Sequence, residues 1–281
     1  MYHFADAGKT NPIKPNCKPI VRRAYAFLLP KHVNFITFSP MELNRFYCPL
    51  ISAPVTELAG SEAHHLAHVL RLGKNDRVEL FDGAGKLAAA IVQSAGGDKV
   101  ALAVENIEYV QPRQCGRIIV AASIAKADRF DWLITKCTEL GVDRISPVLF
   151  ERTVKQPKNS KIVNRWTNLS ISASKQCRRL FLPVIDGPQP LSAVLAVLKK
   201  DYPDGRFLFG SSLPDCPSLA NQPFNSSDVI AFVGPEGGMT DEEITFLRNN
   251  SAVAVRLTET VLRIETAAVA FASILAARRD V

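Results

Sequence analysis

The sequence predicts an α/β fold with a mainly parallel sheet, preceded by a smaller β-rich domain. After Pro112, short apolar runs typical of buried strands alternate with amphipathic helical patterns. Before Pro112, several segments of strand character are separated by glycine-containing turns. Close to the C-terminus, two strand–loop–helix units follow each other, at residues 229–244 and 252–278. Their loops should meet at the C-terminal edge of the sheet, where open α/β folds bind ligands.

The composition is that of a globular protein with room for one large or two ordinary domains. The chain has 281 residues, of which 47% are hydrophobic and 22% charged. No apolar run approaches the roughly 20 residues that cross a bilayer, so we expect no membrane-spanning segment. The formal net charge of +7 suits a polyanionic partner, with nucleic acid first and a membrane surface second.

Cysteine usage predicts a reducing compartment, because the six cysteines are scattered and form no Cys-x-x-Cys pair. We therefore expect reduced thiols and a cytoplasmic protein. His64 and His68 are four residues apart, a spacing that could chelate a metal ion. Because no third ligand lies nearby in the sequence, we interpret them as packing or capping histidines and expect no metal site.

Residues 1–40 differ from the rest of the chain. They contain six basic residues against one acid, Asp6, with several prolines and no sustained periodicity. Basic, acid-poor segments are typical of organellar presequences, although the Ser-rich amphipathic helix is missing here. Met41 opens a stretch that reads as an ordinary start. We favour a disordered extension or a start codon assigned too far upstream; an organellar location is the alternative if the segment is a presequence.

Residues 41–112 are predicted to form the small β-rich domain. The segment from Glu62 to Leu72 has the pattern of a short amphipathic helix, with three apolar side chains facing inward: Leu66, Val69 and Leu70. The predicted strands are 77–81, 87–92 and 100–107, with turns at 82–85 and 96–97. Small barrels of this size commonly bind RNA.

Residues 113–281 are predicted to form the α/β domain. The predicted strands are 117–123, 144–149, 180–185, 206–209, 229–233 and 252–257. The predicted helices are 129–140, 161–179 and 191–199, one that starts after Thr240, and a long apolar helix that ends near Arg278. Gly141 is expected to end the first of these helices as its C′ residue.

The loop Gly234-Pro-Glu-Gly-Gly238 follows a buried strand, and a helix begins after it. Thr240 as N-cap with Glu243 three residues later predicts a capping box. A phosphate-binding P-loop is excluded, because Met239-Thr240 stands where that motif needs Lys-Ser/Thr. Glycines at a strand end let a ligand approach the backbone closely, and a tight turn is the structural alternative.

The second loop adds charge to this edge of the sheet. Arg263 and Glu265 stand at a helix entrance, and Leu257, Val261 and Leu262 offer apolar walls. A cationic ligand with an apolar body and an adenine ring would suit such a site. An ion pair that caps the last helix is the alternative interpretation of the two charges.

A group of basic residues predicts a surface that follows an RNA backbone. Solvated helix faces explain any one of them, but so many within a short span favour RNA. The group comprises Lys126, Arg129, Arg152, Lys155, Lys158, Lys161, Arg165, Lys175, Arg178 and Arg179.

Together, these motifs resemble the RsmE family of ribosomal RNA methyltransferases, over about Met41 to Ala277. The resemblance rests on Gly234-Pro-Glu-Gly-Gly238, Leu262-Arg263-x-Glu265-Thr266-Ala267, Lys136-x-x-Glu139-Leu140-Gly141-Val142, Arg152-Thr-Val-Lys155, Gln176-x-x-Arg179 and His65-Leu66-x-x-Val69-Leu70-Arg71. One departure lies at Leu257-Thr-Glu-Thr260, where the family usually has Leu-Gly-Pro-Arg.

The resemblance implies a PUA-like β-barrel followed by a SPOUT domain with a deep trefoil knot, in an obligate homodimer. It implies methyl transfer from S-adenosylmethionine to N3 of a specific uridine in 16S, small-subunit, ribosomal RNA. The expected partner is that RNA or the assembled small subunit, with no membrane and no metal. A knotted methyltransferase acting on a ribose 2′-hydroxyl or a guanine, and a non-catalytic RNA-binding or ribosome-assembly protein, are the alternatives.

The cofactor residues follow from the resemblance position by position, and the catalytic roles are a hypothesis from the chemistry of N3 methylation. Arg263 is expected to stabilise the uracil anion, and Glu265 to orient Arg263 or accept the proton. The expected cofactor residues are Gly210, Gly234, Glu236, Gly237, Gly238, Leu257, Thr258, Val261, Leu262 and Arg263. The expected RNA-binding residues are Arg71, Lys126, Arg129, Arg152, Lys155, Arg165 and Arg179.

Overall fold

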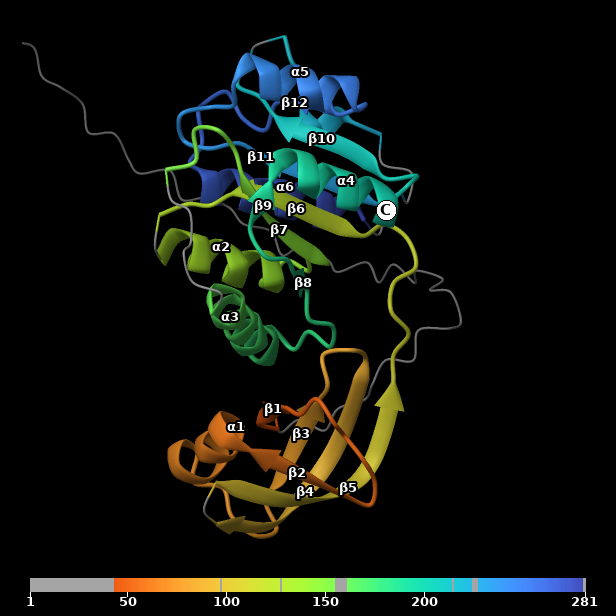
Figure 1. Ribbon diagram of the computed structural model, residues 1–281. Coiled ribbons are helices and arrows are strands. Elements are labelled where there is room, and N and C mark those ends of the chain that lie inside the picture. The colour runs from red at the N-terminus through yellow and green to blue at the C-terminus, as the bar shows by residue number, and fades with distance from the viewer. Residues whose placement is uncertain are drawn as a thin grey trace, which may run out of the picture. The chain divides into compact units, whose positions relative to one another are not determined.

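The computed structural model describes residues 43–96, 98–126, 128–154, 161–213, 215–223 and 227–279. The predictions made for residues 1–40 and for Lys155 therefore lie outside the described residues. Two sheets form in this part of the chain, one from strands before Pro112 and one from strands after it (Figure 1). None of its helices is both long and apolar enough to cross a membrane.

The first sheet has five strands in the order β1-β3-β4-β5-β2. Its strands are β1 (Arg45–Tyr47), β2 (Val55–Ala59), β3 (Arg77–Phe81), β4 (Lys86–Gly96) and β5 (Lys99–Tyr109). β4 and β5 are a long antiparallel hairpin with two register shifts, and β1 is parallel to β3. Phe46, Leu58, Leu66 and Leu102 are buried together in its apolar core. The short strands β1 and β2 were not predicted individually, because three to five residues carry little periodic signal.

The helix predicted from Glu62 to Leu72 is shorter than expected. It consists of α1 (Gly60–His64) and a π-helical turn, η1 (His65–Val69), in which the N–H of Leu70 donates to the carbonyl of His65 at 2.9 Å. Leu66 is buried as predicted, but Val69 and Leu70 are 59% and 37% exposed, so their predicted inward orientation is wrong. The wider turn breaks the 3.6-residue period on which that prediction depended.

The second sheet is parallel throughout, with the strand order β12-β10-β11-β6-β7-β8 and β9 paired to β7. Its strands are β6 (Ile118–Ser123), β7 (Arg144–Leu149), β8 (Val184–Ile185), β9 (Gln189–Pro190), β10 (Arg206–Gly210), β11 (Val229–Val233) and β12 (Val253–Val255). The helices are α2 (Asp128–Glu139), α3 (Ile162–Cys177), α4 (Leu191–Asp201), α5 (Asp241–Asn249), α6 (Ile264–Arg278) and the 3-10 turn η2 (Leu219–Asn221). The α/β prediction is therefore confirmed.

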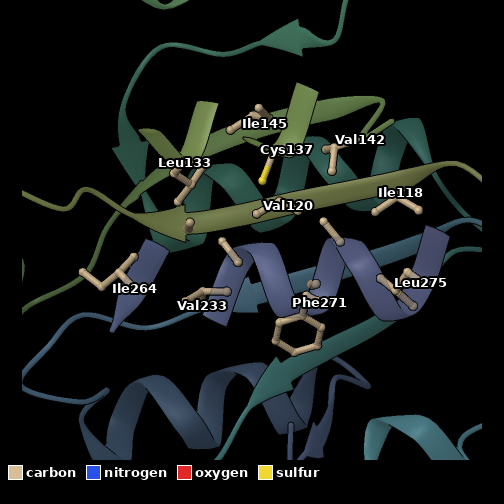
Figure 2. Packing of buried hydrophobic residues seen from close by; sticks show 14 of the residues in the cluster. Ile118, Val120, Leu133, Cys137, Val142, Ile145, Val233, Ile264, Phe271 and Leu275 are labelled. Carbon is tan, nitrogen blue, oxygen red and sulfur yellow. The ribbon is translucent and has the colours of Figure 1, made fainter. Parts of the chain in front are cut away.

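Helices cover both faces of this sheet. Alternate residues of the central strand β6 point to opposite sides, so that Val120 lies in one apolar cluster and Ile119 in the other. The first cluster contains residues of α2, α3 and α6, and the second contains residues of α4 and α5. Figure 2 shows Phe271 and Leu275 on α6, the helix of the first cluster that packs beside β6. Strands buried on both faces explain the continuous apolar runs in the sequence.

Candidate functional site

A pocket of about 420 Å³ opens where three parallel strands end. β10, β11 and β12 are neighbours with the same direction, so the loops that follow them meet at one edge of the sheet. The residues that line the pocket come from the ends of these strands, from the loops that follow them, and from α5 and α6: Phe209, Gly210, Ser211, Ser212, Leu213, Val233, Gly234, Pro235, Glu236, Gly238, Met239, Asp241, Ile244, Leu257, Thr258, Thr260, Val261, Leu262, Ile264, Ala267 and Phe271. This volume is within the range of small-molecule sites.

The glycine turn after β11 forms one wall. The N–H of Gly238 donates to the carbonyl of Pro235 at 2.9 Å, which closes the turn. Gly238 has a φ of +74°, a backbone conformation that side chains disfavour. At Gly234 a Cβ would lie 2.9 Å from Cγ of Met239, so the side chain of Met239 packs directly on this backbone. The turn therefore favours glycine at position 238, for its backbone conformation, and at position 234, for the close packing of Met239.

The predicted capping box at the start of α5 is confirmed. The N–H of Thr240 donates to Oε2 of Glu243 at 2.9 Å, and the N–H of Glu243 donates to Oγ1 of Thr240 at 3.3 Å. Oε1 of Glu243 also accepts a hydrogen bond from the N–H of Glu151 at 2.7 Å, which ties α5 to the loop after β7. The pKa of Glu242 is lowered by its own backbone N–H and by the Thr240 hydroxyl.

The loop after β12 forms the opposite wall. Oγ1 of Thr258 donates to the carbonyl of Thr260 at 2.8 Å, so the segment that departs from the family pattern closes on itself through its own side chain. Val261 is 84% exposed at the rim, and Leu213, from the loop after β10, is 56% exposed. Apolar side chains therefore lie at the rim of both loops, and the lining also includes the carboxylates of Glu236 and Asp241.

Most of the residues predicted to hold a cofactor line this pocket: Gly210, Gly234, Glu236, Gly238, Leu257, Thr258, Val261 and Leu262. Gly237 and Arg263 are not lining residues. The segment Ser211-Ser212-Leu213 lines the pocket but was not predicted. Its position directly after β10 is a signal that could have indicated it, since strand ends build the ligand site in parallel sheets.

The two predicted catalytic residues lie at the start of α6 but do not contact each other in the described residues. Arg263 is the N-cap, exposed, and has no ion-pair partner in the described part of the chain. Glu265 is buried in the first turn, where the helix dipole favours a carboxylate. Its Oε1 lies 3.9 Å from Nε of Arg129, and its buried Oε2 has no hydrogen-bond partner.

The predicted RNA-binding residues have diverse environments. Lys126 and Arg71 are exposed, and Arg165 is ion-paired with Asp131 on a surface of α2 and α3. Arg129 and Arg152 both contact the glycine turn.

Arg179 requires a correction. Its side chain is only 13% exposed, and it donates to the carbonyl of Thr138 at 3.1 Å and pairs with Asp143 at 3.5 Å. Burial lowers the pKa of its guanidinium. Because its charge is used inside the fold, we assign Arg179 to packing between α2 and α3 rather than to RNA.

The described residues contain no group of three or more potential ligands that could hold a metal ion. The rings of His64 and His68 pack against each other, with centroids 4.9 Å apart.

Comparisons with known proteins define the class. Residues 111–276 match the RNA methyltransferase domain family, and residues 58–105 match the RNA methyltransferase PUA domain. The chain is therefore an RNA methyltransferase with a PUA domain, whose α/β domain carries the pocket described above.

Named relatives narrow this class. The ribosomal RNA small subunit methyltransferase E of Synechocystis is 31% identical over 78% of this chain and 71% of its own length. That of Bacillus subtilis is 27% identical over 76% of this chain and 87% of its own length. A crystal structure of the Neisseria gonorrhoeae enzyme bound to S-adenosyl methionine has a TM-score of 0.73, with 28% identity over 83% of this chain and 96% of that one. The chain belongs to the ribosomal RNA small subunit methyltransferase E family.

Proposed function

We propose that this protein transfers a methyl group from S-adenosylmethionine to N3 of a specific uridine in small-subunit ribosomal RNA. The observation that carries the proposal is the pocket at the ends of β10, β11 and β12, in a chain of this methyltransferase family. The Neisseria gonorrhoeae relative, with which this fold aligns, has S-adenosyl methionine bound.

The residues present fit such a donor. The volume of about 420 Å³ accepts a molecule of that size, and glycines at positions 210, 234 and 238 let its polar ring approach the backbone. Leu257, Val261 and Leu262 supply apolar surface for the ring and the chain of the donor. The carboxylate of Glu236, which Arg129 pairs through Oε1, also lines the pocket and suits a cationic ligand.

The bound donor supplies an electrophilic methyl carbon on sulfur. N3 of uracil carries a weakly acidic proton and must lose it as the N–C bond forms and the C–S bond breaks. Much of the rate should come from holding the two reactants in line. The exposed guanidinium of Arg263 is proposed to stabilise the negative charge on the uracil ring.

Glu265 is proposed as the group that accepts the proton, directly or through a water molecule. Support comes from its buried, unpartnered Oε2, while its one ion-pair contact is with Arg129 instead of Arg263. Arg263→Ala should abolish most methylation with little change in S-adenosylmethionine affinity, and Glu265→Gln should do the same. Full activity in either variant would remove that residue from the mechanism.

Three further features belong to the same proposal. A homodimer would cover the apolar rim formed by Val261 and Leu213, and light scattering that gives the monomer mass would contradict it.

A cytoplasmic location agrees with the free cysteines of the described residues; a fluorescent fusion of the full chain that enters an organelle would instead favour a presequence.

A deep trefoil knot of the SPOUT type would involve α6. Supporting this, Leu219 and Arg256 are hydrogen-bonded through their backbones at 2.9 Å, and Arg278 at the end of α6 donates to the carbonyl of Ala220. A crystal structure whose backbone passes through no loop of its own chain would contradict the knot.

Mass spectrometry of ribosomal RNA nucleosides, from cells with and without the gene, tests the reaction. We expect 3-methyluridine to disappear from small-subunit RNA in the deletion and to return with the wild-type gene. Loss of a ribose-methylated nucleoside or a methylguanosine would instead identify another knotted methyltransferase. Calorimetry that shows no S-adenosylmethionine binding would refute the enzyme altogether and favour a non-catalytic RNA-binding protein.

A further inference from the structure

Two arginines that follow neighbouring strands in the sequence contact the glycine turn, and neither lines the pocket. Arg129, in the first turn of α2 after β6, donates from Nη1 to Oε1 of Glu236 at 2.8 Å. Arg152, in the loop after β7, donates from Nη1 to the carbonyl of Gly237 at 2.9 Å. Because β11, β6 and β7 are adjacent in the sheet, the turn after β11 is held by side chains that follow the next two strands.

The loop that carries Arg152 is itself fixed. Oγ1 of Thr153 accepts a hydrogen bond from the N–H of Phe150 at 2.8 Å and lies 3.1 Å from Oγ of Ser123 at the end of β6. A Cβ at Gly237 would lie 3.5 Å from Cδ of Arg152, so the arginine side chain packs directly on the turn. The hydrogen bond to Gly237 therefore starts from an ordered backbone.

Arg129 lies close to acidic residues from two segments around the pocket, the glycine turn and the start of α6. Besides Glu236 of the first loop, it faces Glu265 at the start of α6, with Nε and Oε1 3.9 Å apart. The side chains of Arg129 and Glu236 are each 40% exposed, whereas that of Glu265 is 10% exposed. One guanidinium thus lies between the donor-pocket turn and the proposed proton acceptor.

We propose that Arg129 and Arg152 are positioning residues of the donor pocket, which hold the Gly234–Gly238 turn in its binding shape. The inference rests on the proposed function. A turn with three glycines has much backbone freedom, and a ligand that must order it loses affinity. Two hydrogen bonds from charged donors reduce that freedom before the donor binds. Neither contact involves RNA, so the effect should be present without it.

Calorimetric titration of the full chain with S-adenosylmethionine, without RNA, tests the proposal. Arg129→Gln and Arg152→Gln should each weaken binding by about 2- to 10-fold, a range that reflects charged hydrogen bonds partly screened by solvent. Arg77→Gln is the matched control: it removes another exposed arginine, which pairs with Glu105 in the first sheet and not with the turn. Its affinity should equal that of the wild type.

A double-mutant cycle distinguishes loss of the hydrogen bond between Arg129 and Glu236 from a general loss of positive charge. If Arg129 acts through Glu236, Arg129→Gln combined with Glu236→Gln should bind no more weakly than Glu236→Gln alone, because both changes remove one hydrogen bond. Fully additive losses would contradict that route. Arg152→Lys keeps the charge and should recover part of the affinity, and it remains informative if Arg152→Gln does not fold.

Unchanged S-adenosylmethionine affinity in both glutamine variants, with loss only of affinity for a small-subunit RNA fragment measured by fluorescence anisotropy, would overturn the proposal. The two arginines would then be phosphate contacts alone. Failure of the wild-type chain to bind S-adenosylmethionine would refute the proposed function instead, so the two failures are distinguishable.

Discussion

Replacing Gly238 with alanine tests whether the glycine turn has a required shape. An ideal Cβ at this position meets no atom within 4 Å, so the substitution causes no clash. Its cost is the backbone strain of φ +74°, about 1–2 kcal/mol for an L-residue. Reduced freedom of the unfolded chain offsets about 0.4–1 kcal/mol of this. We expect the free energy of unfolding to fall by about 1 kcal/mol and Tm by about 2–4 °C.

Gly237→Ala is the matched control in the same turn. Gly237 lacks the positive φ, and its Cβ would be in ordinary contact with Arg152, at 3.5 Å from Cδ. We expect stability close to that of the wild type. Urea denaturation of the two variants, followed by the same spectroscopic signal, measures the difference between them directly.

The backbone strain in Gly238→Ala should also change the shape of the donor pocket. If alanine moves position 238 toward negative φ, the hydrogen bond from its N–H to the carbonyl of Pro235 is lost and the pocket wall changes shape. S-adenosylmethionine affinity should then fall in Gly238→Ala and stay near wild type in Gly237→Ala. Equal stability and equal affinity in the two variants would refute the reasoning that the left-handed backbone shapes this wall.

Three other changes test separate parts of the structure. Thr240→Ala removes one half of the capping box and should cost about 1 kcal/mol of unfolding free energy in urea; no loss would contradict the cap. Phe271→Ala opens a cavity in the core beside the pocket and should cost about 3–5 kcal/mol while weakening donor binding; a Tm near that of the wild type would contradict its role. Burial raises the pKa of Cys137 from 9.0 to about 12, so at pH 8 its thiol stays protonated in the folded state. Iodoacetamide should modify the exposed Cys115 and spare Cys137 until denaturant is added; peptide mass mapping that finds native Cys137 alkylated as fast as Cys115 would contradict this.

The elements that the sequence predicts best are those with strong local signals. β7 and β11 have the predicted boundaries; the five residues of β11 are all apolar and buried, and Gly234 ends that run. Gly141 has a φ of +80° and follows α2 after one intervening residue, Leu140, as its predicted C′ role requires. β8 spans only two residues, so the strand predicted at 180–185 is too long; ahead of β8, Phe181 forms an isolated bridge with Ala84 instead of continuing the strand.

The chemistry of single charged residues was harder to predict, since it depends on contacts that are distant in the sequence. Glu236 and Gly237 lie more than eighty residues after Arg129 and Arg152, so no local pattern shows that these arginines contact the turn. Arg179 reads as a solvated helix residue until the fold places Asp143 beside it. The pocket residues were named from the family resemblance, and the ends of the parallel strands independently predicted that the two late loops meet at one edge of the sheet.

The contacts of Arg129 and Arg152 indicate that part of the basic group serves the donor pocket, with consequences for RNA binding. An arginine that donates to a carboxylate or a carbonyl of the donor pocket is partly neutralised there and offers fewer free donors to a phosphate. RNA that competed for the same guanidinium groups would loosen the glycine turn, and by linkage a bound donor would weaken that RNA contact. Lys126 and Arg71 make no such contact with the turn and remain exposed, so they are better candidates for independent phosphate binding. We therefore expect Lys126→Gln or Arg71→Gln to lower the affinity for RNA and to leave the affinity for the donor unchanged. A larger loss of RNA affinity in the Arg129 and Arg152 variants than in these two would place the RNA backbone over the glycine turn itself.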